Sequence, residues 1–454
     1  MDRLAALTQR SPRRAAGTLM VLVAAMSLAM PGLAQDGSGV TVTLQYTDPA
    51  TGQRTPVAGA SFSVFDELGE LVGADITDAE GVVLIPVPGR GVYTIDIDPA
   101  SLPEGVALSN PDRTVGTVDV QEGETVRALF ALIAGEGAAA GSTVTLSRVL
   151  QLAFDGLKEG LFLAMMAIGL SLIFGTTGLV NFAHAEMVTW GMLVAYFFNV
   201  IGLVGIFGFM EGWPAPFGGP VELIGATAIA VVFGGAMGWA FDAGIFNRLR
   251  GRGTSLIAQM VVSIGLAIVV RYTYLYIFAG NPRFFRSYAG QESISLGSVQ
   301  VVPKNLVAMI ITVVVLVLVG LGLQRTRTGR SLRAVADNRD LAESSGIDVQ
   351  KVIRLVWVAG GALAALGGIF FAQSNVIQWD GGSRILLLIF AGVTLGGLGT
   401  AYGALVGSVV VGLGISLSTL FIPVELKNIG ALILLAVILL ARPQGILGQK
   451  ERIG

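Results

Sequence analysis

Long apolar runs fill the chain from about residue 147 onward, and they constrain the fold more than any other feature. Of the 454 residues, 53% are hydrophobic and only 13% are charged. A helix of about twenty apolar residues spans the hydrocarbon core of a bilayer. We therefore predict an α-helical polytopic membrane protein with about seven to nine spans. The expected spans lie near residues 150–174, 185–207, 221–241, 256–278, 306–323, 352–372 and 429–441.

The Gly-rich stretch 385–420 does not fit this scheme simply. It is long for one span and short for two, so a re-entrant hairpin also fits. Glycines recur in it at near four-residue spacing, which lets helices approach closely. We therefore favour tight packing over a moving gate for the set Gly392, Gly396, Gly399, Gly403 and Gly407.

The N-terminal residues 1–34 have the pattern of a secretory signal peptide. Four arginines precede an apolar stretch at 15–30, and the small residues Gly32 and Ala34 follow. The pattern predicts cleavage after Ala34, and an uncleaved signal anchor is the alternative. Either form delivers the next segment outside the cytoplasm.

Residues 35–133 have the composition of an acidic soluble domain. Apolar and polar residues alternate at 40–46, 61–65 and 92–97, with turn signals between them. This predicts an extracytoplasmic β-sandwich of roughly seven strands, followed by a small-residue linker at 134–146 and a membrane domain at 147–454. The segments Pro-Val-Ala-Gly-Ala at 56–60, Thr-Asp-Ala-Glu-Gly at 77–81 and Gly-Val-Tyr-Thr at 91–94 resemble prealbumin-like or carboxypeptidase-regulatory-like modules.

Several classes of function are excluded by what the chain lacks. It has no cysteine and a single histidine, His184, so we predict no metal site and no cofactor. The net charge of −2 argues against nucleic acid as a partner. No Gly-x-x-x-x-Gly-Lys-Ser/Thr motif is present, so the chain is not expected to hydrolyse ATP, and we predict that it is not an enzyme.

Three arginine-rich segments set the expected orientation. Segments 248–252, 325–339 and 442–452 belong on the cytoplasmic side by the positive-inside rule. The first span then begins outside, in agreement with the signal peptide. Arg271, Arg283, Arg286 and Lys304 oppose this assignment, because they lie in or beside a loop expected outside.

The loop 326–348 has the pattern of a short polar helix, a turn and a second short helix capped by Gly346. Leu332, Val335, Ala336, Leu341 and Ala342 give it a small apolar face, which suits docking to a groove of a soluble partner. A topology signal alone is the alternative, but it needs only the arginines. The loop resembles the coupling loop of ABC importer permeases, with the pattern Gly-x-x-x-Arg-Ala … Ala … Gly-Ile. The expected coupling residues are Gly329, Arg330, Arg333, Ala334, Ala336, Asn338, Leu341, Ala342, Gly346 and Ile347.

Three more segments, 175–187, 248–255 and 442–448, resemble branched-chain amino acid permeases of the same class. The chain departs from that family at Ala185, where the family usually has glycine after the histidine. The resemblance implies transport of leucine, isoleucine or valine across the cytoplasmic membrane, with urea or short amides as alternative substrates. It also implies a second homologous permease, one or two ATPase subunits, an extracytoplasmic substrate-binding protein and contact with membrane lipid. A secondary transporter and a membrane-anchored receptor module are the rival classes.

A candidate substrate pathway lies near residue 180. Asn181, His184 and Glu186 are costly at membrane depth, where ionisable residues usually line a pathway or form pairs. Gly175 and Gly178 predict a helix break, whose free backbone groups suit a zwitterionic amino acid. Gly396 and Gly399 complete the expected pathway set. The alternative is structural: His184 and Glu186 satisfy neighbouring helix ends.

Overall fold

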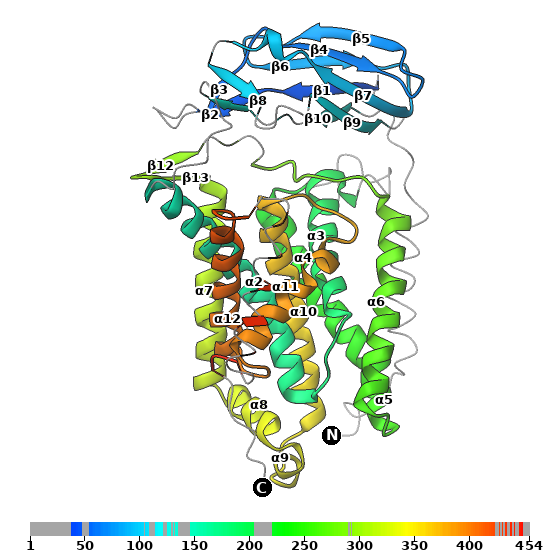
Figure 1. Cartoon of the computed structure of the whole chain (residues 1–454). Coiled ribbons are helices and arrows are strands. Elements are labelled where there is room, and N and C mark those ends of the chain that lie inside the picture. The colour runs from blue at the N-terminus through cyan, green and yellow to red at the C-terminus, as the bar shows by residue number, and fades with distance from the viewer. Residues whose placement is uncertain are drawn as a thin grey trace. The chain divides into compact units, whose positions relative to one another are not determined.

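The computed structural model describes residues 38–47, 54–134 with short gaps, 146–203, 220–422 with short gaps, and a few later positions that include 445–447. The chain divides into two compact units, one within Met30–Thr143 and one that includes Val144–Gly454 (Figure 1). The expected signal peptide, nearly all of the expected linker and most of the span expected at 429–441 lie outside the described residues.

The N-terminal unit consists of short strands. Two larger sheets have the strand orders β10-β1-β6 and β5-β4-β7-β9, and two further pairs are β2–β3 and β8–β11. All neighbours in the two larger sheets are antiparallel except β1 and β10. The strands are β1 (Gly39–Thr43), β2 (Gln45–Thr47), β3 (Arg54–Pro56), β4 (Ser61–Phe65), β5 (Leu71–Ile76), β6 (Val82–Pro86), β7 (Gly91–Ile97), β8 (Val106–Leu108), β9 (Val115–Val120), β10 (Thr125–Ala128) and β11 (Leu132–Ala134).

One apolar core joins the two larger sheets. Side chains alternate along a strand, so every second residue faces the same side. Val40 and Val42 of β1 are fully buried, as are Phe62 and Val64 of β4 in the facing sheet, and all four belong to one cluster. The strand-rich region expected from the sequence is therefore present, and its larger sheets face each other as in a β-sandwich.

The second unit is helical (Figure 1). Six helices of the described residues are long and apolar enough to cross a membrane, and α11 is a shorter apolar helix. The helices are α2 (Leu146–Thr177), α3 (His184–Tyr196), α4 (Leu223–Phe241), α5 (Asn247–Gly251), α6 (Leu256–Phe278), α7 (Pro303–Arg325), α8 (Arg327–Asp337), α9 (Arg339–Ser344), α10 (Val349–Ser374), α11 (Gly381–Gly396) and α12 (Ala401–Ser418). Single π-helical turns, Phe197–Ile201 and Asp242–Phe246, follow α3 and α4, and a hairpin of β12 (Ile294–Leu296) and β13 (Val299–Val301) precedes α7.

Glycines set the distances between the central helices. A Cβ at Gly169 of α2 would lie 2.7 Å from the carbonyl oxygen of Gly360 in α10. A Cβ at Gly238 of α4 would lie 2.0 Å from the carbonyl oxygen of Trp357, also in α10. In lipid there is little hydrophobic drive between helices, so close backbone approach through small residues is what holds them together. Helices α2 and α10 form the centre of the unit, whereas α6 and α7 lie at its periphery.

The Gly-rich stretch forms two helices, α11 and α12, joined by a turn at 397–400. Their contact depends on glycine, because a Cβ at Gly396 would lie 1.8 Å from the carbonyl oxygen of Gly403. A Cβ at Gly407 would lie 2.1 Å from that of Gly392. Four of the five glycines singled out in the sequence therefore pack helix against helix.

Candidate functional site

A break between α2 and α3 places polar residues deep inside the helical unit. Helix α2 ends at Thr177, Gly178 takes a φ of +70°, and regular helix resumes only at His184. The Nε2 atom of His184 lies 2.9 Å from the carbonyl oxygen of Met166. Met166 is eleven residues before the end of α2, which is about 16 Å along the helix axis. Helix α3 therefore starts deep within the unit, and irregular backbone at such depth is tolerated where protein surrounds it.

Asn181, His184 and Glu186 are all fully buried around this break. The Asn181 side-chain oxygen accepts a hydrogen bond from the backbone N–H of Ala183 at 3.1 Å, which supports the turn into α3. One atom of each polar side chain has no hydrogen-bond partner in the described structure: Asn181 Nδ2, His184 Nδ1 and Glu186 Oε2. A buried unpaired polar group costs about 1–3 kcal/mol. Three buried polar atoms beside the break are thus left without a hydrogen-bond partner among the described residues.

An ion pair ties this segment to α6. Arg271 donates from Nε and Nη2 to the same oxygen of Glu186, Oε1, at 3.1 and 3.0 Å. The hydroxyl of Tyr274 donates to the backbone oxygen of Glu186 at 3.0 Å. A charged side chain at membrane depth is costly unless it has an oppositely charged, hydrogen-bonded partner. Arg271 therefore has a local partner, and it need not act as a topology signal.

Arg283 also has a local role in the loop expected outside. Its Nη2 donates to the carbonyl oxygen of Phe278, the last residue of α6, at 2.7 Å. Its Nη1 donates to the hydroxyl of Tyr196 at 2.9 Å. A cation at a helix C-terminus satisfies the last carbonyls and interacts favourably with the helix dipole. The structure thus gives structural roles to two of the four basic residues that opposed the expected orientation.

The expected pathway glycines fall in two places. Gly175 meets the turn between α11 and α12, since its Cβ would lie 2.9 Å from the carbonyl oxygen of Gly399. Gly396 instead lies in the α11–α12 contact described above. At Ala185, where the sequence departs from the family, Gly382 at the start of α11 lies close, since a Cβ there would be 2.0 Å from the Ala185 carbonyl oxygen. Close packing at this point is provided by the opposite helix.

The loop between α7 and α10 folds as two short helices, α8 and α9. The Thr326 hydroxyl accepts from the Gly329 N–H at 2.9 Å, and the Asn338 side chain accepts from the Leu341 N–H at 2.9 Å, so each helix has an N-cap. At the end of α9, Gly346 has a φ of +84°, and the Ile347 N–H donates to the Ala342 carbonyl at 3.1 Å. This is a Schellman C-cap.

The apolar face expected on this loop is divided in the structure. Val335 and Ala342 are buried in the main apolar cluster of the helical unit, and Leu332, Ala334 and Ile347 pack partly against it. Ala336 and Leu341 are exposed instead, and so are Arg330 and Arg333. We call these last four residues the basic loop surface. The inward side fixes the loop to the unit, while the basic loop surface is exposed among the described residues.

A buried aspartate was missed by the reasoning from sequence. Asp242 follows α4 and is paired with Arg250 of α5, and Nε of Arg354 in α10 lies 3.8 Å from it. The sequence pattern that could have indicated this ion pair is an acidic residue at the end of an apolar run, followed by arginines eight to ten positions later. The cluster joins the arginine-rich segment after α4 to the first turns of α10, and α5, α8 and α9 lie at the same end of the unit (Figure 1).

Comparison with known proteins identifies the family. The model of the family described as "Branched-chain amino acid transport system / permease component" matches residues 152–441. The chain belongs to this permease family. The permease is 30% identical over 309 residues to the high-affinity branched-chain amino acid transport system permease protein LivH of Escherichia coli (strain K12), covering 66% of this chain and 96% of LivH. It is 28% identical over 314 residues to BraD of Pseudomonas aeruginosa, with the same two coverages.

The permease region accounts for the helical unit and leaves the strand unit outside the match. The permease is thus a polytopic membrane protein and a transport subunit of the ABC class. Among solved structures, the minor pilin GBS52 of Streptococcus agalactiae is 15% identical and covers 25% of this chain and 51% of its own, with a TM-score of 0.20. The broken helix and the basic loop surface both lie within the matched residues.

Proposed function

We propose that the chain is the permease subunit of an ABC importer that carries leucine, isoleucine or valine across the cytoplasmic membrane. ATP is hydrolysed by one or two separate ATPase subunits, a second homologous permease completes the pathway, and an extracytoplasmic binding protein delivers the substrate. The observation that carries this proposal is the family match over 152–441, which includes a two-helix loop with exposed arginines.

The two-helix loop is built to transmit force. A Cβ at Gly329 would lie 2.3 Å from the carbonyl oxygen of Leu323, so α8 packs directly on the end of α7. Val335 and Ala342 anchor the loop in the apolar cluster. In the proposed cycle, closure of the ATPases pushes on the basic loop surface, and α7 and α10 move with it between outward and inward states. The Asp242–Arg354 contact extends this coupling to the end of α4.

The proposed substrate pathway passes the break between α2 and α3. Asn181, His184 and Glu186 each hold one unpartnered polar atom there, and unwound backbone beside them suits the charged ends of an amino acid. Gly175 and Gly399 allow close backbone contact between the end of α2 and the turn after α11, and Gly178 supplies the positive φ that follows the end of α2. We assign Gly396 to helix packing within the same region.

The proposed domain order has residues 1–34 as a signal peptide, 35–133 as an extracytoplasmic β-sandwich of the prealbumin-like type, 134–146 as a linker and 147–454 as the permease domain. The loop of α8 and α9 then faces the cytoplasm, and the β12–β13 hairpin lies on the outer side. These two elements lie at opposite ends of the helical unit (Figure 1).

Single cysteines test this orientation cleanly, because the chain has no native cysteine. Ser295→Cys in β12 and Ser344→Cys in α9 both replace exposed residues. A membrane-impermeant maleimide is expected to label Ser295→Cys in intact spheroplasts, and Ser344→Cys only after permeabilisation. The native chain, which should remain unlabelled, is the control. The reverse labelling pattern would refute the proposed orientation.

The proposed function is tested by isolating the complex and measuring transport. Affinity purification of the tagged chain from detergent-solubilised native membranes is expected to recover an ATPase and a second permease. Proteoliposomes of that complex, supplied with the binding protein and ATP, are expected to take up radiolabelled leucine with competition from valine but not from urea. Competition by urea and not by valine would move the substrate to the amide class. Recovery of the chain alone, from membranes that express the partners, would contradict the ABC assembly.

A further inference from the structure

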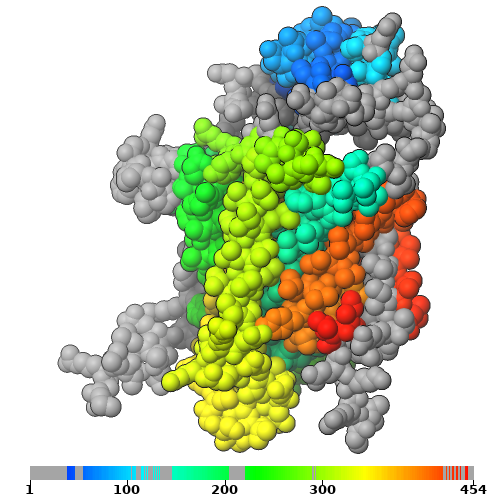
Figure 2. Space-filling view, turned by 90° about the vertical axis from the view of Figure 1, so that its left-hand side faces the viewer, coloured from blue at the N-terminus to red at the C-terminus, as the bar shows by residue number. Residues whose placement is uncertain are grey.

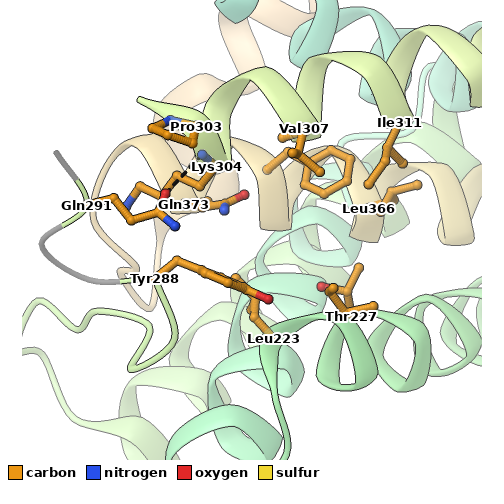
Figure 3. Close-up of a pocket in the computed structure, with 13 residues that line it drawn as sticks. Leu223, Thr227, Tyr288, Gln291, Pro303, Lys304, Val307, Ile311, Leu366 and Gln373 are labelled. Atoms are coloured by element: carbon orange, nitrogen blue, oxygen red, sulfur yellow. Dashed lines mark hydrogen bonds between the residues drawn. The ribbon is translucent and has the colours of Figure 1, made fainter. Parts of the chain in front are cut away.

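A cavity of about 310 Å³ lies between α4, α7 and α10, away from the break and the two-helix loop (Figure 3). It is formed by the first turns of α4 and α7, the last turns of α10, and the loop that contains Tyr288 and Gln291. Helix α7 lies at the periphery of the unit, where its apolar side chains are exposed along its length (Figure 2). The cavity is therefore at the membrane-facing side of the helical unit.

The two ends of the cavity differ in chemistry. Tyr288, Gln291, Lys304 and Gln373 gather at one end, and the backbone N–H of Lys304 is held by the side chain of Gln291 at 3.0 Å (Figure 3). From there the lining is apolar except for Thr227 as far as Ile311, which is seven residues beyond Lys304 along α7 and so about 10 Å deeper. A polar end at the membrane edge and an apolar end toward the hydrocarbon match the polarity of the bilayer itself.

The charge of the lining selects among possible ligands. Lys304 is the one charged residue of the 13 that line the cavity, and no acidic side chain of the described residues forms a salt bridge with it. A zwitterionic amino acid needs a partner for its ammonium as well as for its carboxylate, and the lining holds no carboxylate. A ligand with one anionic head and a long apolar tail fits both features.

We propose that this cavity binds an anionic glycerophospholipid, with its phosphate at Lys304 and one acyl chain between α4, α7 and α10. The lipid joins the ends of three helices that otherwise meet across a gap. No residue of the break or of the basic loop surface lines this cavity. Lipid retention is measured on the purified complex without substrate, so its outcome is distinguishable from that of the transport assay.

The test is native mass spectrometry of the full complex after delipidation and incubation with equal amounts of phosphatidylglycerol and phosphatidylcholine. The native complex is expected to retain phosphatidylglycerol preferentially. Lys304→Glu is expected to lower the retained ratio of phosphatidylglycerol to phosphatidylcholine by about tenfold, which corresponds to loss of one charge-assisted contact. Lys351→Glu is the matched control, since Lys351 is an exposed lysine at the other end of α10, and it should leave the ratio unchanged.

A second variant tests the acyl-chain part of the site. Val307 is partly exposed and lines the cavity, so Val307→Trp fills it without entering the buried core. It is expected to reduce retention of both lipids, at an unchanged melting temperature. The proposal is overturned if folded Lys304→Glu keeps the native lipid ratio, or if leucine displaces phosphatidylglycerol from the native complex.

Discussion

Replacing Arg333 by glutamate is expected to reduce recovery of the ATPase with the permease at least about tenfold and to lower leucine uptake in proportion. Arg333 is exposed on α8 beside Arg330, Ala336 and Leu341, so its charge is available to a partner and is not used inside the fold. Reversing one charge at a desolvated contact costs about 2 kcal/mol or more. The measurement is the amount of ATPase that co-purifies with each variant, together with uptake in proteoliposomes.

The control for this substitution separates docking from folding. Arg90→Glu makes the same charge reversal at an exposed position of the strand unit, and it should leave both readouts unchanged. Both variants should melt at the native temperature, because neither arginine forms a described salt bridge. Normal ATPase recovery and uptake with Arg333→Glu would show that the arginines of this loop act only in setting topology.

Glu186→Leu is expected to destabilise the helical unit by about 3–5 kcal/mol, since it leaves Arg271 unpaired at membrane depth. Glu186 is fully buried and Arg271 has only 27% of its side chain exposed, so water offers little compensation. The double substitution Glu186→Leu with Arg271→Leu removes both charges and should restore most of the lost stability. Thermal unfolding of all four proteins in detergent gives the coupling energy of the pair.

A more exposed ion pair gives the reference for this cycle. Asp380 directly precedes α11 and Arg384 lies one turn later; the side chain of Arg384 is 58% exposed and that of Asp380 is 16% exposed. Arg384→Leu is expected to change stability by no more than about 1 kcal/mol. If Glu186→Leu were as mild as Arg384→Leu, the buried pair would contribute little to holding α6. Loss of uptake in a stable Glu186→Gln protein would instead favour a direct place in the pathway.

The sequence predicts those parts of the fold that depend on local pattern. The expected span 256–278 coincides with α6, because Ser255 supplies an N-cap and the apolar run ends at Ala279. The two-helix loop was also predictable, since Thr326, Asn338 and Gly346 act on residues only a few positions away. Helix caps of this kind depend on residues within a few positions of the helix end, so they can be predicted from a short stretch of sequence.

Features that depend on depth or on distant partners were not predictable in the same way. Hydropathy gave one span for 185–207, but it contains no information on where α3 begins relative to Met166. The partner of Glu186 lies 85 residues away in α6, and no local pattern connects them. Arg271 looked like a misplaced loop charge for this reason. Asp242 is an intermediate case, because Arg250 lies only eight residues away whereas Arg354 comes from the distant helix α10.

The peripheral position of α6 has a mechanical consequence. Only 17% of its apolar stretch is buried. Ser263, Arg271 and Tyr274 link it to Phe182 and Glu186, and Tyr274 also contacts Met237 of α4. Lipid tails are as apolar as the side chains they would replace, so separating α6 from its neighbours costs little hydrophobic free energy. The position of α6 therefore depends mainly on its polar contacts with the segment before α3 and with α3 itself. A change in the fold of that segment is expected to displace α6.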